Sequence, residues 1–252
     1  MFVSCGEKRN NPLIQNLDKS WTVTTDTLNI KMQVDVPSVI QADMYENGLI
    51  PHPYKSNVEP QLLWIPQHEW VYSLDFRAED YILREDVIEL VFEGLDTYAD
   101  VWFNGEKIIH SDNMFRTYSY DVKDLIKENN KIKIKFYPFD KERDSLIETY
   151  RLRFPEKYAV MRKAAYQNGW DWAPRYMNMG IWQPVYIKAW TRSTICSASV
   201  ITKDIHDDKA DLFFEACINA DVEHNISLQL FQEDEKILDQ NINLTKGTNY
   251  YS

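Results

Sequence analysis

The sequence predicts an all-β protein with two domains, and three observations support this fold class. The 252 residues are enough for two separate hydrophobic cores. Runs of strand length recur from Trp21 to about Trp190, and a second series follows them. Segments with helical periodicity are scarce. We therefore expect a β domain over residues 12–191 and an incomplete one over 192–252, after a disordered or processed segment at 1–11.

The first domain has its clearest strand signals in its middle third. Residues Val87–Phe92 form a short, mostly apolar run. Residues Ala99–Phe103 are followed by Asn104-Gly105, a dipeptide typical of tight hairpins, so the chain is expected to reverse there. Residues Lys131–Phe136 alternate lysine with apolar side chains, which predicts a strand with one buried and one solvated face.

Helix is expected in only two short places. One turn is predicted at Asp121–Ile126 with Asp121 as its N-cap, and a second short piece at Ser145–Arg153. The segment Pro37–Pro66 is rich in Pro, also contains Asn and Gly, and has little periodicity. A loop of this length in a compact domain is more often functional or draped over a sheet than idle.

The second domain shows a regular succession of strand-like stretches separated by polar turns. This spacing suggests an immunoglobulin-like sandwich, which normally has about seven strands. With four such stretches we expect the domain to be truncated and the chain to be the opening portion of a longer protein. The stretches are 195–202, 210–219, 225–231 and 236–244.

Composition excludes several classes of function. The formal net charge is −11 and the basic residues are scattered, which argues against a nucleic-acid partner. The three cysteines form no CxxC pair, and the five histidines show no HExxH spacing. The sequence therefore indicates no cofactor, no metal site and no disulfide framework.

The N-terminus carries a weak targeting signal. Residues Phe2–Gly6 look like the tail of a bacterial lipoprotein signal, in which a small residue precedes a lipid-accepting cysteine, here Cys5. The apolar region that should precede it is absent, so an ordinary cysteine in an unstructured N-terminus is the alternative. The first interpretation predicts an extracytoplasmic protein, either periplasmic or lipid-anchored through Cys5.

The residues from Gly169 to Arg175 are the strongest functional signal. They read Gly-Trp-Asp-Trp-Ala-Pro-Arg, and a Gly-Ile-Trp sequence follows at 180–182. Indole faces suit the C–H faces of a sugar ring, and a carboxylate between them can accept hydrogen bonds from its hydroxyls. The motif therefore suggests a carbohydrate site, although tryptophans are also common in cores.

Over nearly its whole length the chain resembles the N-terminal part of the β-mannosidases of glycoside hydrolase family 2. The resemblance rests on an ordered set of motifs that also includes Gly169–Arg175. The other pieces are Val36-Pro37, Asn47–Pro51, Trp70–Tyr72, Phe92–Val101, Asn104-Gly105, Asn113–Arg116, Arg162–Ala164 and Gly180–Trp182.

The resemblance implies a jelly-roll β-sandwich of the galactose-binding-like type, then an immunoglobulin-like domain that leads into a catalytic (β/α)8 barrel. The barrel would carry the two glutamates of a retaining mechanism, about 5 Å apart, so no catalytic residue is expected in this segment. The implied substrate is a terminal β-mannoside.

The substrate-binding residues predicted here are Asp171, Trp170, Trp172, Arg175 and Asn113. Asp171 would accept hydrogen bonds from mannose hydroxyls, and Trp170 or Trp172 would form the wall. We expect Arg175 to pair with Asp171 and orient it; the alternative is that the pair is a loop brace that does not contact sugar. Asn113 could instead stabilise a turn.

Three alternative functions remain open. The chain could be a stand-alone carbohydrate-binding module or a segment of another family 2 glycosidase, of the β-galactosidase or β-glucuronidase type. A scaffolding or oligomerisation domain would use the tryptophans as an apolar interface patch.

Overall fold

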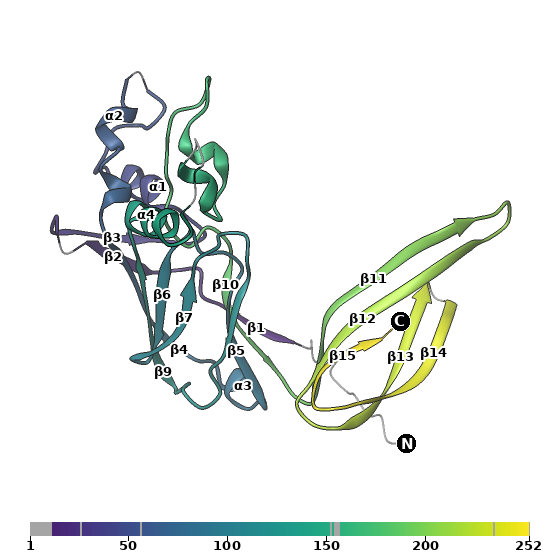
Figure 1. The fold of residues 1–252 in the computed structure, drawn as a ribbon. Helices are drawn as coiled ribbons and strands as arrows, with labels where there is room; N and C mark the ends of the chain where they lie inside the picture. The colour runs from purple at the N-terminus through teal and green to yellow at the C-terminus, as the bar shows by residue number, and fades with distance from the viewer. Residues whose placement is uncertain are drawn as a thin grey trace. The chain divides into compact units, whose positions relative to one another are not determined.

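A computed structural model describes residues 12–25, 27–55, 57–151, 153, 157–233 and 235–251. Cys5, the predicted lipid-accepting residue, lies outside these ranges. The chain divides into two compact units: one contains Ile14–Leu83 and Glu89–Lys188, and the other contains Arg84–Ile88 and the residues from Ala189 onward. Strands dominate both units, which confirms the predicted all-β class (Figure 1).

The first unit is built on a six-stranded antiparallel sheet. Its buried side chains come from alternation along each strand. In Lys131–Phe136, for example, Ile132, Ile134 and Phe136 are fully buried and the lysines face outward, as predicted. In spatial order the strands are β3 (Ile30–Val34), β2 (Trp21–Thr25), β4 (Trp70–Arg77), β9 (Asn129–Phe136), β6 (Ala99–Phe103) and β7 (Glu106–Ser111).

The hairpin between β6 and β7 turns at Asn104-Gly105, as predicted. Both residues have positive φ, 50° and 93°, which is the backbone that a tight hairpin of the observed hand requires. The Asn104 side chain also donates to the carbonyl of Leu125 at 2.9 Å, so the turn is tied to a neighbouring loop.

A second sheet faces the first, and large side chains fill the space between them. The fully buried aromatic side chains are Trp21, Trp70, Phe92, Phe103 and Phe136. Burying apolar surface stabilises the fold by roughly 25 cal/mol per Å² removed from water, so these rings hold the two sheets together. The second sheet has the order β1 (Leu13–Asn16), β10 (Val185–Trp190), β5 (Val87–Phe92) and β8 (Tyr118–Asp121).

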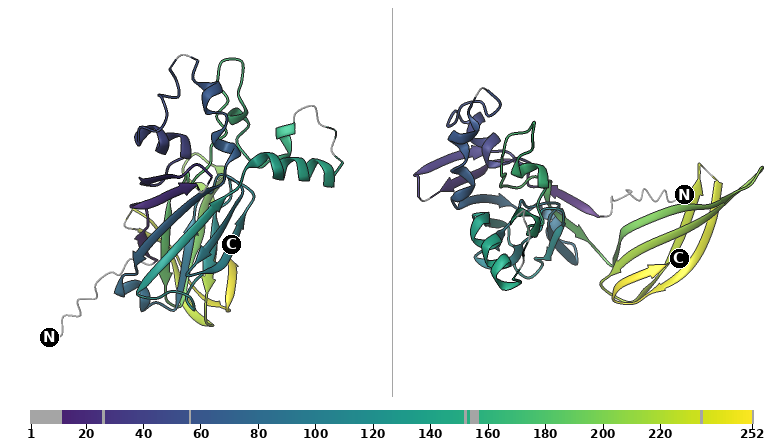
Figure 2. Two further views of the ribbon diagram at one scale, coloured as in Figure 1. Left: turned by 90° about the vertical axis from the view of Figure 1, so that its left-hand side faces the viewer. Right: turned by 45° about the horizontal axis from the view of Figure 1, so that its top comes forward.

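The short helices are mostly gathered at one end of this sandwich (Figures 1 and 2). The segment Pro37–Pro66, predicted as a long loop, in fact contains α1 and α2 and runs over this end. The loop that contains Gly169–Arg175 lies at the same end (Figure 2). The helical segments of the unit are α1 (Ile40–Glu46), α2 (Glu59–Leu62), η1 (Ile65–Gln67), α3 (Asp80–Leu83), α4 (Phe139–Thr149), η2 (Lys157–Val160) and η3 (Ala165–Asn168).

The two helical predictions had different outcomes. Asp121–Ile126 forms a single hydrogen-bonded turn, in which the Ile126 amide donates to the Val122 carbonyl at 2.8 Å. The Asp121 carboxylate caps it by accepting from the Lys123 amide at 2.9 Å, as expected. The helix predicted at Ser145–Arg153 instead begins at Phe139 and ends at Thr149. Pro138 stands at its N-cap, a position that the apolar pattern did not indicate.

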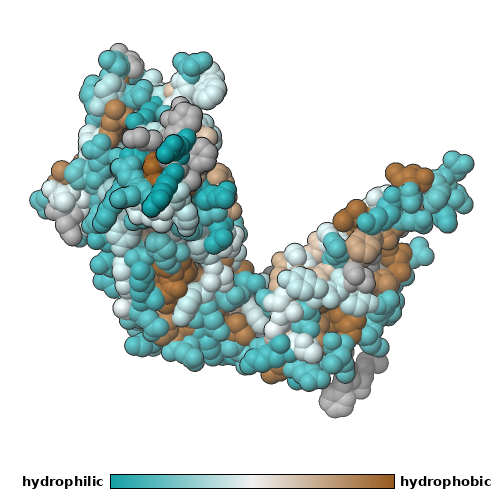
Figure 3. Space-filling model, viewed as in Figure 1, coloured by the Kyte–Doolittle hydropathy of each residue, from teal (hydrophilic) through white to brown (hydrophobic). Residues whose placement is uncertain are grey.

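The second unit has two small sheets. The four predicted strand stretches are present, and one further strand follows them. Its core contains Ala216, Ile218 and Leu244. Apolar side chains are also exposed on this unit (Figure 3), and Ile205, at the end of the strand Ser193–Ile205, is 82% exposed. β11 (Ser193–Ile205), β12 (Ala210–Ala220) and β15 (Gly247–Tyr251) form one sheet; β13 (His224–Gln232) and β14 (Glu235–Leu244) form the other.

None of the helices in the described part of the chain combines the length and apolar character needed to cross a bilayer.

Candidate functional site

The predicted sugar-binding motif forms the tip of a tight loop. The amide of Trp170 donates to the carbonyl of Ala173 at 3.0 Å, and the Ala173 amide donates back to Trp170 at 3.1 Å. These two bonds leave Asp171 and Trp172 at the corner of the turn. The tryptophans are exposed rather than buried, Trp170 by 69% and Trp172 by 84%. This exposure removes the interpretation of the pair as core residues.

Gly169 is required by the backbone that leads into this tip. It has φ +89°, and an added Cβ would lie 3.3 Å from the Cβ of Arg175. Glycine therefore allows the chain to turn sharply after η3 and to pass close to the backbone of Arg175, where the loop returns.

The Asp171 carboxylate has no ion pair or hydrogen bond with any residue that the structure describes. The predicted Asp171–Arg175 pair is therefore wrong. Arg175 lies instead against Tyr158: its Nη2 donates to the tyrosine hydroxyl, and its guanidinium carbon is 4.8 Å from the ring centroid. A planar guanidinium gains both a hydrogen bond and a cation–π contact in this position, which a solvated carboxylate at an exposed turn does not offer.

Asn113 stabilises a turn, which was the alternative interpretation of this residue. Its Oδ1 accepts a hydrogen bond from the backbone amide of Phe115 at 3.0 Å, and the backbone amide of Asn113 donates to the Tyr118 hydroxyl at 3.0 Å. Asparagine commonly holds the chain two residues on in this way. The backbone of Asn113 also pairs with Arg162 in a short parallel bridge.

A buried ion pair between Asp96 and Lys163 lies beneath the loop. Both side chains are 1% exposed. The ammonium group also donates to the carbonyl of Asn178 at 2.6 Å and lies 4.6 Å from the ring centroid of Phe139. Burial lowers the pKa of Lys163 to about 8, and the negative charge of Asp96 opposes this shift. The contact with Asp96 therefore favours the charged form of Lys163, against the effect of burial.

The same cluster fixes both ends of the loop. Gln167, at the start of the loop, donates from Nε2 to the second oxygen of Asp96 at 3.0 Å. The Oε1 of Gln167 accepts a hydrogen bond from the backbone amide of Asn178, at the far end of the loop, at 2.9 Å. Because Lys163 also binds the carbonyl of Asn178, one buried centre holds the ten residues between Gln167 and Asn178. These hydrogen bonds fix both ends of the loop and so restrict the motion of its exposed tip at Trp170–Trp172.

Sequence reasoning missed this cluster as a unit. Asp96 and Lys163 each fall within a motif that supported the family resemblance, but nothing in the sequence pairs two residues 67 positions apart. The signal that was available is their residue type, since charged side chains embedded in otherwise apolar motifs are seldom buried without a partner.

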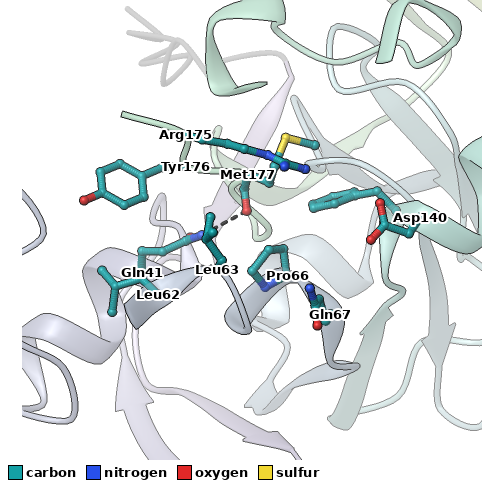
Figure 4. Close-up of a pocket in the computed structure, with 10 residues that line it drawn as sticks. Gln41, Leu62, Leu63, Pro66, Gln67, Asp140, Arg175, Tyr176 and Met177 are labelled. Atoms are coloured by element: carbon teal, nitrogen blue, oxygen red, sulfur yellow. Dashed lines mark hydrogen bonds between the residues drawn. The ribbon is translucent and has the colours of Figure 1, made fainter. Parts of the chain in front are cut away.

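A pocket of about 530 Å³ adjoins the loop on the side of α1. Its wall on one side comes from α1 and the segment that follows it, and on the other from the loop that carries Trp172. A smaller cavity of about 90 Å³ lies next to it and shares Gln41 and Tyr176 with it (Figure 4). The larger pocket is lined by Val39, Gln41, Ala42, Tyr45, His52, Pro53, Tyr54, Tyr166, Gln167, Trp172, Ala173, Pro174, Tyr176 and Asn178.

No group of His, Cys, Asp or Glu side chains in the described ranges could hold a metal ion.

Asp43 is a buried carboxylate on α1, the helix that forms one wall of the pocket. The Tyr72 hydroxyl donates to it at 3.0 Å. Desolvation raises the pKa of Asp43 to about 6, although hydrogen bonds from Ser38 and Tyr72 pull the pKa down. Folding therefore favours the protonated form of Asp43.

This shift predicts a pH dependence of stability. A carboxyl group whose folded pKa lies above its unfolded value stabilises the fold below about pH 4 and loses that contribution as the pH rises through about 6. We expect the Asp43 contribution to the free energy of unfolding to fall by roughly 3 kcal/mol between pH 4 and 7. Urea unfolding over this range checks it by comparison with Asp43→Asn, which should lack the loss. Parallel pH profiles of the two proteins would refute the assignment to Asp43.

Comparisons with known proteins define the class to which the chain belongs. Residues 21–183 match the family described as glycosyl hydrolase 2 galactose-binding domain-like. The chain belongs to glycoside hydrolase family 2, as the motifs predicted, and its first unit is the galactose-binding-like sandwich of that family.

Similar proteins within this family are β-mannosidases. The chain is 32% identical to β-mannosidase A of Emericella nidulans over 182 residues, and 29% identical to the β-mannosidase of Mus musculus over 188 residues. These matches cover 68% and 69% of this chain but only 19% and 21% of the relatives. The crystal structure of a β-D-mannosidase from Dictyoglomus thermophilum superimposes with a TM-score of 0.83 at 26% identity, covering 95% of this chain and 30% of that one.

Proposed function

We propose that the chain is the N-terminal sugar-binding part of a retaining β-mannosidase that hydrolyses terminal, non-reducing β-D-mannose residues. It would supply one wall of the substrate pocket, and a (β/α)8 barrel outside this sequence would supply the catalytic glutamates. The observation that carries the proposal is the exposed Trp170–Trp172 tip, in which an unpaired carboxylate stands between two solvent-facing indoles. The similarity to β-mannosidases supports the choice of sugar.

The chemistry of the tip suits a sugar ring. Asp171 has no ion pair in the described part of the chain, so both of its oxygens are available to accept hydrogen bonds from substrate hydroxyls. Trp170 and Trp172 would cover the C–H faces of the ring. Contacts of this kind, made away from the bond that breaks, contribute binding energy that orients the substrate for reaction.

Arg175 and Asn113 act indirectly in this proposal. Arg175 holds the loop through Tyr158, and Asn113 holds the turn after β7. Neither is assigned a direct contact with mannose, which narrows the direct substrate contacts to residues 170–172.

Hydrolysis of aryl glycosides by the complete gene product tests this function. We expect turnover of the β-mannoside to exceed that of the β-galactoside and the β-glucuronide, because the comparisons favour mannosidases. The 252-residue chain alone is expected to be inactive, since the catalytic carboxylates would be absent from it.

Three results would contradict the proposal. Faster cleavage of the galactoside or glucuronide would assign the chain to another activity of the same family. Saccharide binding without any hydrolysis by the complete gene product would make it a carbohydrate-binding module. Turnover by the 252-residue chain alone would place the catalytic groups within it.

A further inference from the structure

The pocket beside the tip has an aromatic lining and no strong charge. Six of its lining side chains, five from Tyr or Trp and one from His, are aromatic rings, and they come from two distant parts of the chain. Among the lining residues there is no Asp, Glu, Lys or Arg. At about 530 Å³ the pocket falls within the size range of small-molecule sites, about 300–1,000 Å³. Its composition therefore favours a neutral ligand with apolar faces.

Contacts between rings hold the aromatic wall in place. Tyr54 meets Tyr176 edge to face, with ring centroids 5.6 Å apart and planes at 89°. The hydroxyl of Tyr176 donates to the carbonyl of Pro53. On the same side, His52 contacts Tyr45 with centroids 5.0 Å apart. Rings held in this way lose little conformational freedom when a ligand binds.

Gln41 adds a polar group that lacks a partner. Its side chain is buried, with 5% of the residue exposed. The amide nitrogen donates to the Met177 carbonyl at 2.9 Å, the bond drawn in Figure 4. The amide oxygen has no hydrogen-bond partner among the described residues. A buried acceptor without a partner is costly. Gln41 lines both the pocket and the smaller cavity beside it, so a ligand hydroxyl that reached this oxygen would satisfy it.

The pocket is continuous with the tip through Trp172, which belongs to both. A saccharide whose terminal ring lies at Asp171 therefore has this pocket beside it. We propose that the pocket is a subsite for the second pyranose ring of the substrate, the ring attached to the terminal mannose. Tyr54 and Tyr176 cover its C–H surface, and Gln41 Oε1 accepts one of its hydroxyls. This inference rests on the proposed function and deepens it, because it selects substrates with a neutral sugar next to the terminal one.

Binding of two ligands to the 252-residue chain tests the subsite. The probes are methyl β-mannoside, which has one ring, and β-1,4-mannobiose, which has two; their dissociation constants can be measured by chemical-shift perturbation in NMR. The wild-type chain should bind mannobiose at least about tenfold more tightly. Tyr54→Ala should remove most of this preference and leave the affinity for methyl β-mannoside unchanged. Tyr54→Phe should retain the preference, because the ring carries the contact.

Controls separate this inference from the proposed function. Tyr54 is 75% exposed, and Tyr150, which is 67% exposed and does not line the pocket, provides the matched variant Tyr150→Ala with no expected effect. Asp171→Ala should weaken both ligands, which reports on the proposed function alone.

The subsite is overturned by any of three results. These are equal affinity of the wild-type chain for the two probes, no binding of mannobiose, and a Tyr54→Ala variant that retains the preference for mannobiose. A loss of both ligands in Tyr54→Ala would also overturn it, because the residue would then belong to the terminal-ring site.

Discussion

Replacing Lys163 by methionine is expected to lower the free energy of unfolding by about 3–5 kcal/mol. The change leaves the Asp96 carboxylate buried without its counter-charge, and Asp96 is 1% exposed. It also removes the donor to the carbonyl of Asn178. Urea unfolding at pH 7 measures the loss, which would be among the larger effects of a single substitution in a domain of this size.

A double variant provides the control. In Asp96→Asn/Lys163→Met the buried charge is gone, and the asparagine side chain introduced at position 96 can still accept from Gln167. The double variant should therefore be more stable than Lys163→Met alone, since replacing both partners of a buried pair commonly costs less than breaking it. A loss below about 1 kcal/mol in Lys163→Met, or a double variant less stable than the single one, would rule out a buried charge as the cause.

Local features of the chain were predictable because their cause is local. The alternation at Lys131–Phe136 predicted strand β9 with its correct buried face, since side chains on a strand alternate in direction. Asn104-Gly105 predicted its hairpin because both residues tolerate positive φ. The carboxylate cap at Asp121 was predictable because its hydrogen bond is also local, joining residues two positions apart.

Features that depend on tertiary contact were not predictable. Helix α1 has no side-chain hydrogen bond at its N-cap, Val39, and no sequence signal marks its start. It is held by contacts such as the Gln41–Met177 hydrogen bond, which spans 136 residues. The partner of the Arg175 side chain was wrongly predicted for a related reason. Proximity in sequence favoured Asp171, whereas the folded chain places Arg175 against Tyr158.

The tip motif was predicted from residue types alone, and the structure adds its exposure and its supports. Two exposed tryptophans are unfavourable in water unless something covers them, and the rigid anchorage through Asp96 costs desolvation of two charges. Both observations are consistent with a loop that is selected for what it contacts. The pocket beside it was indicated only indirectly, by the unusual length of the segment Pro37–Pro66.

Replacing Asp171 by alanine is expected to lower kcat/KM of the complete gene product for an aryl β-mannoside by roughly 30-fold or more, which corresponds to about 2 kcal/mol. The physical reason is the loss of charge-assisted hydrogen bonds to mannose hydroxyls that help orient the ring. Because the side chain is exposed and makes no ion pair or hydrogen bond with the described part of the chain, the free energy of unfolding of the variant should lie within about 0.5 kcal/mol of the wild-type value.

Two further variants make the Asp171 result specific. Asp171→Asn keeps one carbonyl acceptor and loses the charge, so its kcat/KM should lie between those of the wild type and Asp171→Ala. Asp124 is another exposed aspartate, situated in the turn after β8, and Asp124→Ala should retain full activity. If Asp171→Ala cleaves the aryl mannoside at the wild-type rate, Asp171 does not contact the substrate, and the exposed tryptophans would then have to be explained by an interface with another protein surface.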